Sequence, residues 1–454
     1  MQSLARIFIV FGLTAPFLGV PGAAAELTLE AAVAKALDQN PSLQAQEAKA
    51  EAAQARSREA QGNRWPTVDL METFAYSDNP AEVFAMTLNQ ERFSFDDFFM
   101  SDPNRPDALD TWITRLEVTQ PIYTGGQLGA RIEQADLMAE AASLDLGHRR
   151  EQVAFQVGQA FLNARKALEN VQLLERSLET TKAHVRLAEQ LASQGVIIEA
   201  DVLNARVHLA RMEEMLLDVA SMADVAQSAL DLHMGVDQTI RHELGLAPTI
   251  ATGSTPLIDW TERATADRRD LRARRLEVQA ARLEEKAEKA GYLPEIGLVG
   301  RYDLYDDVAF GSNGSSGSVM AVAKINLFRG GQDSAGVEAA RNRAQSAALG
   351  IEQMEQGIQL EVRAAFEAVQ TARKRMATAE NAVSAAREAH RVREHRFQQG
   401  LDKMIDLLDA ETSLHDAEVR LLTANYDHRI ATYRLYFLSG ASLVEALGIR
   451  DSEE

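Results

Sequence analysis

Two long stretches of the chain repeat their apolar residues at the spacing of a coiled coil. In each half of the sequence the apolar positions step by three or four residues over several turns. The positions are Val157, Phe161, Ala164, Leu168, Val171, Leu174 and Leu178, then Val362, Phe366, Val369, Ala372, Met376, Ala379, Val383 and Ala386. Many of them are alanine, which lets neighbouring helices approach closely. The pattern predicts long packed helices that contact more than one neighbour.

Each helical stretch ends at a Gln-Gly pair and resumes a few residues later at an aspartate. Gly195 is followed by Asp201 and Gly400 by Asp406, so the two copies are 205 residues apart. Because glycine adopts the left-handed conformation that closes a helix, each segment is predicted to be a hairpin tip between two helices. Two tips at one constant offset indicate an internal duplication.

Four shorter segments alternate apolar and polar residues with a period of two. They are expected as strands at about 68–76, 112–122, 296–305 and 318–328. One face of each segment is apolar and the other is charged, as a transmembrane β-barrel with a wet interior requires. A soluble β-sandwich shows the same alternation. Four strands cannot close around a water-filled lumen, so spanning a membrane would require several chains to pool their strands.

A pair of glycines follows the second and the fourth of these segments. The pairs are Gly125 with Gly126 and Gly330 with Gly331, again 205 residues apart. They are predicted to be the turns from strand to helix. From each pair to the next tip the chain has about 65–70 residues, which at 1.5 Å per residue makes a helix of roughly 100 Å.

These signals divide the chain into five parts. Residues 1–25 carry a positive start, an apolar run and small residues, which are typical of a secretory signal peptide. The other parts are a first repeat over 26–235 with its tip near 195–203, a connector over 236–269, a second repeat over 270–440 with its tip near 400–409, and a tail over 441–454. No apolar run of spanning length follows the signal, so a mature chain in a membrane would enter it as strands.

The loops between the paired strands differ in length and character. The first, over 77–110, is long, acidic and rich in phenylalanine, whereas the second, over 306–318, is short and rich in Gly and Ser. Long loops on one side and tight turns on the other are typical of outer-membrane proteins. We expect the phenylalanines of the long loop to pack against one another.

Composition narrows the range of partners. The formal charge of −20 argues against nucleic acid or an anionic lipid surface as a partner. The absence of cysteine excludes disulfides, thiolate metal sites and a lipoprotein anchor. Aromatic residues make up only 6 % of the chain, which favours long helices over a bulky globular core.

No arrangement typical of an enzyme is found in the sequence. His390 and His395 are five residues apart, which does not align two metal ligands on one helix face. The glycine-rich segment 311–318 contains neither a nucleophile elbow nor a phosphate loop. We therefore predict no catalytic residue, no cofactor and no metal site, and expect the nine histidines to lie on hydrated helix faces.

The chain resembles the TolC-like outer-membrane efflux proteins over essentially its whole mature length. The resemblance rests on the segment LTLEAAVAKALDQNPSL from Leu27, on the two glycine pairs and on the duplicated tips, all in the same order. It implies an α+β membrane protein in which a homotrimer shares one twelve-stranded β-barrel and a coiled-coil tunnel of long helices.

The resemblance also implies a function, a place and partners. The chain is expected to be the exit duct of a tripartite efflux or type I secretion system. It would sit in the outer membrane of a Gram-negative bacterium and extend into the periplasm. There it would dock to a periplasmic adaptor (membrane fusion) protein and to an inner-membrane transporter of the RND, ABC or a similar class.

In that family, acidic side chains and their partners narrow the duct at the tips. By resemblance, the constriction here includes Asp201, Asp406 and Asp409, with Phe397 at an aromatic position. Asp402 stands where well-studied members carry an arginine, and Phe397 lacks the hydroxyl of the usual tyrosine. The closed state is therefore expected to be held less by ion pairs, or by different ones.

The spacing of the acidic residues predicts a common location. Asp402, Asp406 and Asp409 are four and three residues apart, so they are predicted to share one helix face. In a trimer they would form acidic rings that attract cations. The alternative is that Asp402 or Asp406 caps the returning helix while the others face solvent. The expected docking surface for the adaptor is formed by Gly195, Val196, Gly400, Leu401 and Lys403.

Two other classes of protein compete with the duct. One is a soluble periplasmic coiled-coil adaptor or scaffold, which would lack a lipid-facing apolar band. The alternating strands favour the duct over this class. The other is an envelope enzyme, for which the sequence offers no candidate catalytic group.

Overall fold

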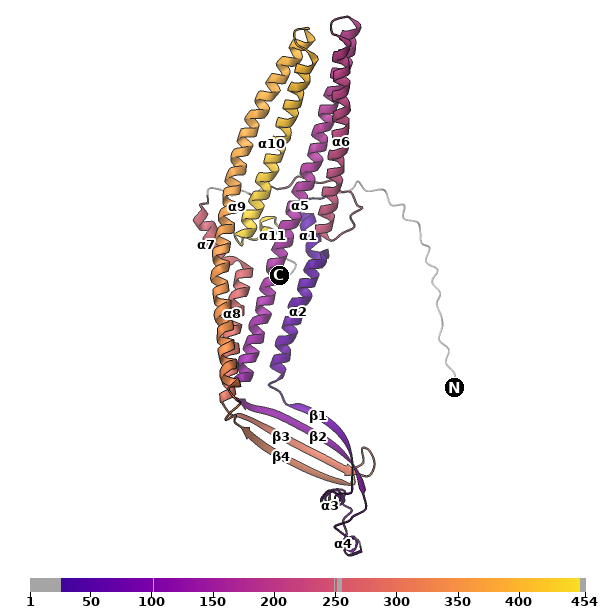
Figure 1. The fold of residues 1–454 in the computed structure, drawn as a ribbon, viewed down its shortest axis with the longest axis vertical. Coiled ribbons are helices and arrows are strands. Elements are labelled where there is room, and N and C mark those ends of the chain that lie inside the picture. Colours follow the sequence, from indigo (N-terminus) through magenta and orange to yellow (C-terminus); the bar gives the residue numbers. More distant parts are fainter. Residues whose placement is uncertain (1–25, 101, 249, 251–254, 450–454) are drawn as a thin grey trace, which may run out of the picture.

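The computed structural model describes residues 26–100, 102–248, 250 and 255–449. The chain is elongated, with a four-stranded sheet at one end and two long helical hairpins at the other (Figure 1). The signal peptide expected over 1–25, and residues 450–454 of the expected tail, lie outside the described residues.

Two helices run through the whole helical body. They are α5 (Gln127–Ser193) and α9 (Gln332–Gln398), with 67 residues each (Figure 1). Every residue of the predicted apolar seam on these helices is buried or half-buried. The predicted coiled-coil packing and the predicted helix length are therefore confirmed.

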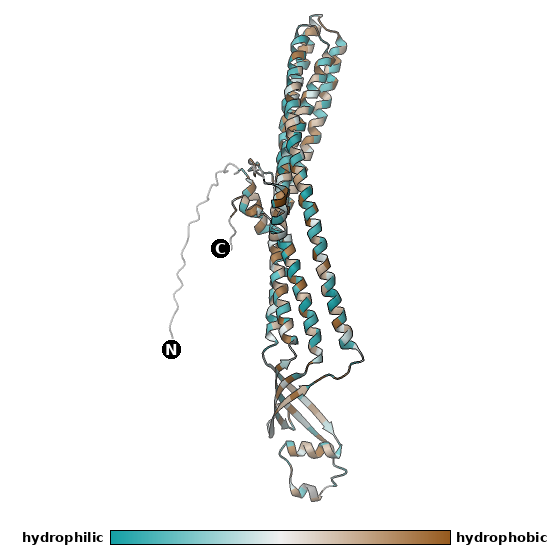
Figure 2. Ribbon diagram, turned by 90° about the vertical axis from the view of Figure 1, so that its left-hand side faces the viewer, coloured by the Kyte–Doolittle hydropathy of each residue, from teal (hydrophilic) through white to brown (hydrophobic). Residues whose placement is uncertain are grey.

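Each long helix turns back into a second helix. These are α6 (Glu199–Met234), which packs on α5, and α10 (Met404–Leu438), which packs on α9. Hydrophilic and hydrophobic residues are interspersed along the helical body (Figure 2). Among the helices of the described residues, none combines the length and the apolar character needed to cross a membrane.

The lower part of the helical body is completed by pairs of helices stacked end to end with α6 and α10. The pairs are α1 (Leu29–Gln39) with α2 (Pro41–Gly62), and α7 (Leu257–Asp267) with α8 (Arg269–Lys289). At the end of α6 the side-chain amide of Asn40 donates to the His233 carbonyl at 2.7 Å. At the end of α10 a Cβ on Gly440 would lie 2.9 Å from the backbone nitrogen of Arg268. Each repeat thus contributes one continuous helical strand and one made of stacked helices.

The second repeat begins earlier than the sequence predicts. Helices α1 and α7 both have 11 residues, and Leu29 and Leu257 are 228 residues apart, as are the starts of α2 and α8. The repeat therefore starts at Leu257 rather than at 270, and the connector is shorter than 236–269. Trp260 and Ala264 of α7 are buried in a core shared with α9, so this helix belongs to the packed body.

The sheet is antiparallel, with the strands in the order of the sequence. The strands are β1 (Thr67–Ser77), β2 (Leu109–Thr124), β3 (Glu295–Asp306) and β4 (Gly314–Lys324). The first three lie where they are predicted, but β4 begins and ends four residues before the predicted 318–328. Its pairing stops at Lys324 because the partner strand β3 starts opposite it at Glu295, after Pro294, which has no N–H to donate.

The two faces of the sheet differ in chemistry. On one face, the Arg115 guanidinium lies 2.7 Å from Asp303, and Arg301 lies 2.5 Å from Glu117, both across the β2–β3 pair. On the other face large apolar side chains are exposed, with Val319 at 81 %. Further exposed members are Val68, Leu70, Leu116, Leu298 and Tyr302. The predicted alternation of a charged and an apolar face is confirmed.

The long loop between β1 and β2 is folded. It contains α3 (Pro80–Asn89) and α4 (Phe95–Met100). The second loop, which the structure describes in full, has no such helices; the short 3₁₀ helix η1 (Ala290–Tyr292) lies before β3 and outside both loops. The ring of Phe93 lies 5.5 Å from that of Phe84 and 5.6 Å from that of Phe95, with edge contacts in both cases. The expected packing of phenylalanines is confirmed for these three rings.

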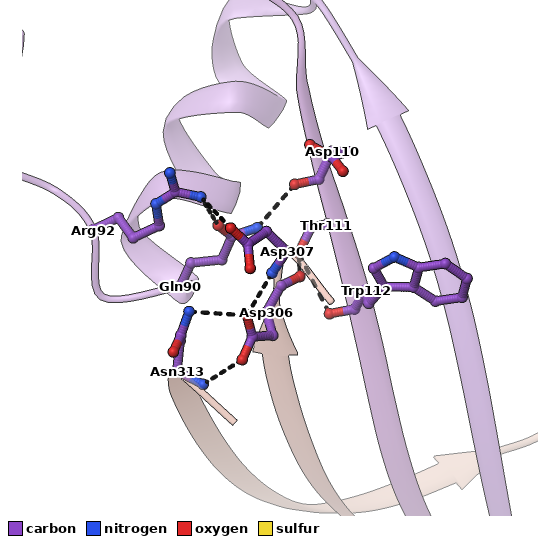
Figure 3. Close-up of polar contacts among 8 residues, drawn as sticks. All are labelled: Gln90, Arg92, Asp110, Thr111, Trp112, Asp306, Asp307 and Asn313. Atoms are coloured by element: carbon purple, nitrogen blue, oxygen red, sulfur yellow. Dashed lines mark hydrogen bonds and ion pairs between the residues drawn. The ribbon is translucent and has the colours of Figure 1, made fainter. Parts of the chain in front are cut away.

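Polar contacts tie this loop to the β3–β4 turn at the end of the sheet (Figure 3). The Gln90 amide donates to the Asp110 carbonyl at 3.0 Å, and Arg92 lies 3.4 Å from Asp307. Asp306 closes the turn by accepting from the backbone and the side chain of Asn313, at 3.1 and 2.9 Å. The loop is therefore bonded both to β2 and to the β3–β4 turn.

The largest core lies about halfway along the helices. We call it the waist; it includes Phe161 of α5, Met234 of α6, Tyr433 of α10 and Leu443 of the short helix α11 (Leu443–Ala446). The Tyr433 hydroxyl donates to the carbonyl of Pro248 in the connector at 2.9 Å. The described part of the expected tail is therefore packed into this core.

Candidate functional site

Both hairpin tips close with the same backbone turn. Gly195 has φ +75° and Gly400 has φ +71°, in the left-handed region. In both tips the residue after the glycine donates its N–H to a carbonyl five residues earlier at 2.9 Å. This arrangement satisfies the last carbonyls of α5 and α9. The structure places the two glycines at the turns where the duplicated sequence predicts them.

The two tips touch each other within one chain. A Cβ on Gly400 would lie 3.6 Å from a methyl carbon of Val196. Below this contact the four helices share a buried apolar core, which we call the tip cluster. It consists of Val185, Ala188, Val202, Ala205, Phe397, Met404, Leu407 and Leu408. The hairpins are therefore packed together at their ends.

Phe397 lies inside the tip cluster. Its side chain is fully buried, with an exposed fraction of 0 %. Within one chain its ring therefore packs between the hairpins and does not reach the surface. Any contribution of Phe397 to a constriction would come from holding the two hairpins together.

Asp402 is held by two arginines from the end of α9. Its carboxylate accepts from Arg393 Nη1 at 3.0 Å and from Arg396 Nε at 2.9 Å. The side chain of Asp402 is only 5 % exposed, whereas those of the arginines are about half exposed. Burial alone would raise the pKa of Asp402, but the bonds from the two guanidinium groups lower it. We call these three residues the Asp402 brace.

The prediction that three acidic residues share one helix face is wrong for Asp402. Helix α10 begins at Met404, so Asp402 precedes it and points toward α9 instead. The capping alternative is also wrong, because Lys403 is the N-cap residue and no side chain accepts from the first turn of α10.

The remaining acidic residues occupy equivalent places in the two repeats. Asp201 and Asp406 are each the third residue of a returning helix and are half-buried, while Asp409 lies one turn further on and is exposed. Carboxylates in the first turn of a helix are favoured by the helix dipole. The end of the hairpins therefore carries acidic side chains that are available to solvent or to another chain.

Four apolar side chains are exposed at the tips. Val196 is 52 % exposed and Leu401 is 62 % exposed, and Ile198 and Ile405 beside them are also exposed. Lys403 is exposed between them. We call Val196, Ile198, Leu401 and Ile405 the tip patch.

The predicted strand-to-helix glycines lie directly before the long helices. All four have positive φ, between +62° and +87°, in the left-handed region. Their positions are Gly125 and Gly126 before α5, and Gly330 and Gly331 before α9. They set the direction of each long helix relative to the sheet.

Sequence reasoning missed a polar layer that is buried directly below the tip cluster. Glu411 of α10 is 4 % exposed, and both of its carboxylate oxygens are occupied. The Thr181 hydroxyl donates to one oxygen at 2.6 Å, and His184 Nδ1 lies 3.1 Å from the other. The layer thereby links α5 of the first repeat to α10 of the second.

Three further histidines complete this polar layer. His208 of α6 and His415 of α10 are buried, and the ring of His390 of α9 lies 5.8 Å from that of His184. The expectation that histidines lie on hydrated helix faces is therefore wrong for His184, His208 and His415. A signal was present, because Glu411 and His415 continue the three-and-four spacing of Met404 and Leu408. Polar residues at seam positions indicate a buried polar layer.

The polar layer does not have the geometry of a metal site. Across the part of the chain that the structure describes, no group of three or more His, Cys, Asp or Glu side chains is arranged to hold a metal ion. The layer is therefore a network of hydrogen bonds and imidazole rings.

Comparison with known proteins places the chain in a family. The sequence model of the outer membrane efflux protein family matches residues 32–236 and 260–441. The outer membrane efflux protein BepC of Brucella suis is 23 % identical over 349 residues, which cover 76 % of this chain and 75 % of BepC. The alkaline protease secretion protein AprF of Pseudomonas aeruginosa is 22 % identical over 339 residues, covering 73 % and 70 %.

A solved structure shares the fold. The outer membrane channel CmeC of Campylobacter jejuni superimposes with a TM-score of 0.78 at 15 % identity, covering 100 % of this chain and 95 % of CmeC. The family model matches most of the chain, and the two relatives are an outer membrane efflux protein and a protease secretion protein. The chain therefore belongs to the outer membrane efflux protein family and serves as an exit duct in the outer membrane.

Proposed function

We propose that three copies of this chain form a passive duct across the outer membrane and periplasm, and that the duct is gated at the hairpin tips. The observation that carries the proposal is the two-faced sheet, which pairs charged residues on one face and exposes apolar residues on the other. Four strands are too few to enclose a lumen. Three such sheets joined at β1 and β4, the outer strands of each sheet, would enclose the ion pairs and present the apolar face to lipid.

The gate of this duct is assigned to the acidic residues and to the contacts between hairpins. In a ring of three chains Asp201, Asp406 and Asp409 lie around a narrow mouth and attract cations. The Asp402 brace and the tip cluster hold the mouth closed. This assignment needs no catalytic group, so the protein acts as a conduit and not as an enzyme.

The tips are also assigned as the docking surface for a periplasmic adaptor, which connects the duct to an inner-membrane transporter. The tip patch supports this because four apolar side chains are exposed at the farthest point from the sheet. Because the relatives include an efflux protein and a protease secretion protein, the export system is of one of these two kinds. A soluble adaptor, the alternative prediction, leaves the apolar face of the sheet unexplained.

Cation block of single-channel current tests the gate. We expect divalent or trivalent cations on the periplasmic side to block wild-type current in a planar lipid bilayer, because acidic rings concentrate them at the mouth. The double variant Asp406→Ala and Asp409→Ala is expected to abolish the block.

The matched control for the cation block is Asp218→Ala, which removes an exposed carboxylate from α6 away from the tip. It is expected to leave the block unchanged. If the double variant is blocked as strongly as the wild type, the acidic rings do not form the constriction.

A further inference from the structure

The polar layer lies between two apolar cores at the upper end of the helices. Above it is the tip cluster, and below it is a smaller core of Leu174, Leu178 and Met212. The layer receives one histidine from each of the four helices: His184 from α5, His208 from α6, His390 from α9 and His415 from α10. All four helices of the two hairpins therefore contribute to it.

The layer holds one carboxylate and has little capacity for additional protons. Glu411 already accepts from Thr181 and His184. Among the described residues, the Nε2 atoms of His208 and His390 are buried without a hydrogen-bond partner. His415 is 7 % exposed, and its Nδ1 lies 3.1 Å from the hydroxyl of Ser177. A proton added to these rings would place positive charges inside a packed core without new acceptors.

We propose that this polar layer is a proton-sensitive latch that joins the two hairpins at neutral pH and releases them on acidification. The proposal deepens the proposed gating at the tips and rests on it. Opening the hairpins would expose the imidazole rings to water, where each can take a proton at little cost. Protons therefore favour the separated hairpins over the packed ones.

The charges around the layer do not cancel those additional protons. On α6, Arg211 adds positive charge next to His208, and on α9, Arg387 is already paired with Glu418 of α10 at 3.0 Å. On α10, Asp409 acts on His208, and Asp416 and Glu418 act on His415. The buried centre contains only Glu411 as a negative group among the residues described, so a second or third imidazolium is unpaired there.

The direction of the pH effect follows from the buried groups. Burial lowers the pKa of His208 and of His415 below the ordinary 6.5. The packed state therefore loses stability as the pH falls from 6.5 through these lowered values. Burial alone would raise the pKa of Glu411, but the bonds from His184 and Thr181 lower it, so its contribution is lost only below 4.5. Both effects release the latch in acid, and the histidines act first.

The distance between the two tips tests the latch directly. Because the chain has no cysteine, Val196→Cys and Leu401→Cys introduce two exposed label sites, one on each tip. The full-length protein is spin-labelled, mixed with excess unlabelled chain and measured by pulsed electron resonance at about pH 7.5 and about pH 5.5. We expect a short, narrow distance at the higher pH and a longer one at the lower pH, with a midpoint below 6.5.

Two variants and one control decide the assignment. The double variant His208→Phe and His415→Phe is expected to keep the short distance at both pH values, because it removes the two rings whose pKa is lowered by burial. Glu411→Gln is expected to lengthen the distance already at the higher pH. The control is His395→Phe, an exposed histidine on α9, which is expected to respond like the wild type. Helix content by circular dichroism shows which variants fold. If Glu411→Gln does not fold, the double histidine variant alone decides whether the latch exists.

The outcomes separate the latch from the duct. A wild-type distance that does not change with pH overturns the latch, whatever current the protein carries. A pH response that survives in the double histidine variant overturns it as well, and so does a response to Zn²⁺ but not to protons. If the distance responds to pH but the tips do not control current, the latch stands and the proposed gating fails.

Discussion

The two hairpin tips share one backbone turn but are held by different side chains. In the second tip Asp402 bonds to Arg393 and Arg396, so the turn is tied to α9 by charge. The positions 205 residues earlier are all apolar. They are Ile197, Ala188 and Leu191, and they belong to the tip cluster or pack against it. The duplication has thus kept the backbone of the tip while its lateral contacts diverged.

This difference separates two physical roles. Apolar contacts in the first tip depend weakly on salt, whereas the ion pairs of the Asp402 brace are partly exposed and are screened by salt. The first hairpin has an exposed ion pair between Arg206 and Glu189, but its turn is not tied by charge. We therefore expect an ionic or charged partner to act on the second tip more than on the first. The following predictions test this asymmetry.

The largest effect is expected from Phe397→Ala. The fully buried ring fills the tip cluster, and its counterpart in the first tip is already an alanine, Ala192. Removing the ring leaves a cavity and is expected to cost about 3–5 kcal/mol in local stability. Hydrogen exchange of the amides at the tips measures this loss.

The control for the ring is Val196→Ala at an exposed position, for which a change within about 0.5 kcal/mol is expected. If Phe397→Ala costs no more than this control, the tip cluster does not hold the hairpins together.

An intermediate effect is expected from Asp402→Asn. The substitution leaves two guanidinium groups without their carboxylate and frees the second tip only. We expect roughly a tenfold rise in the open probability of the channel in a planar bilayer. Asp218→Asn, on an exposed face of α6, is the control and is expected to conduct like the wild type. An unchanged open probability for Asp402→Asn would show that the brace has no part in closure.

Effects that are equal to each other, and similar in size to that of Asp402→Asn, are expected from alanine at the two tip glycines. Gly195→Ala and Gly400→Ala both place a side chain at positive φ, which costs about 1–2 kcal/mol. A Cβ meets nothing within 4 Å at the first position and makes only an ordinary contact of 3.6 Å at the second. Matched thermal unfolding of the two variants measures the costs. A clear inequality would mean that the backbone turns are not equivalent.

Much of the fold is predictable because the apolar residues recur at regular spacings along the sequence. The three-and-four spacing determines which faces of α5 and α9 are buried, and the alternation of β1 to β3 determines the two faces of the sheet. Other features depend on packing between elements, which produces no regular spacing in the sequence. Helix α7 shares its length with α1 but little of its sequence, so the start of the second repeat is not visible. Strand β4 ends where its partner begins, although the alternation continues beyond Lys324.

The site was predictable in its backbone and less so in its side chains. The glycines at the tips need one particular backbone conformation, so their positions can be recognised from sequence. The direction of Asp402 depends on where α10 begins. The helix face predicted for Asp402 requires a helix that includes residue 402, but α10 begins at Met404. The histidines are predicted on hydrated helix faces because polar residues usually lie there, although the seam positions of Glu411 and His415 indicate burial.

The waist has a mechanical consequence. From Phe161 in this core to the end of α5 there are 32 residues, which make a stiff rod of roughly 50 Å above a fixed fulcrum. A pivot of about one degree at the fulcrum would swing the far end by roughly 0.8 Å, and about five degrees by roughly 4 Å. Such a swing is larger than the 3.6 Å that separates an ideal Cβ on Gly400 from a methyl carbon of Val196. A small rotation of the helices at the waist is therefore enough to separate the two hairpin tips.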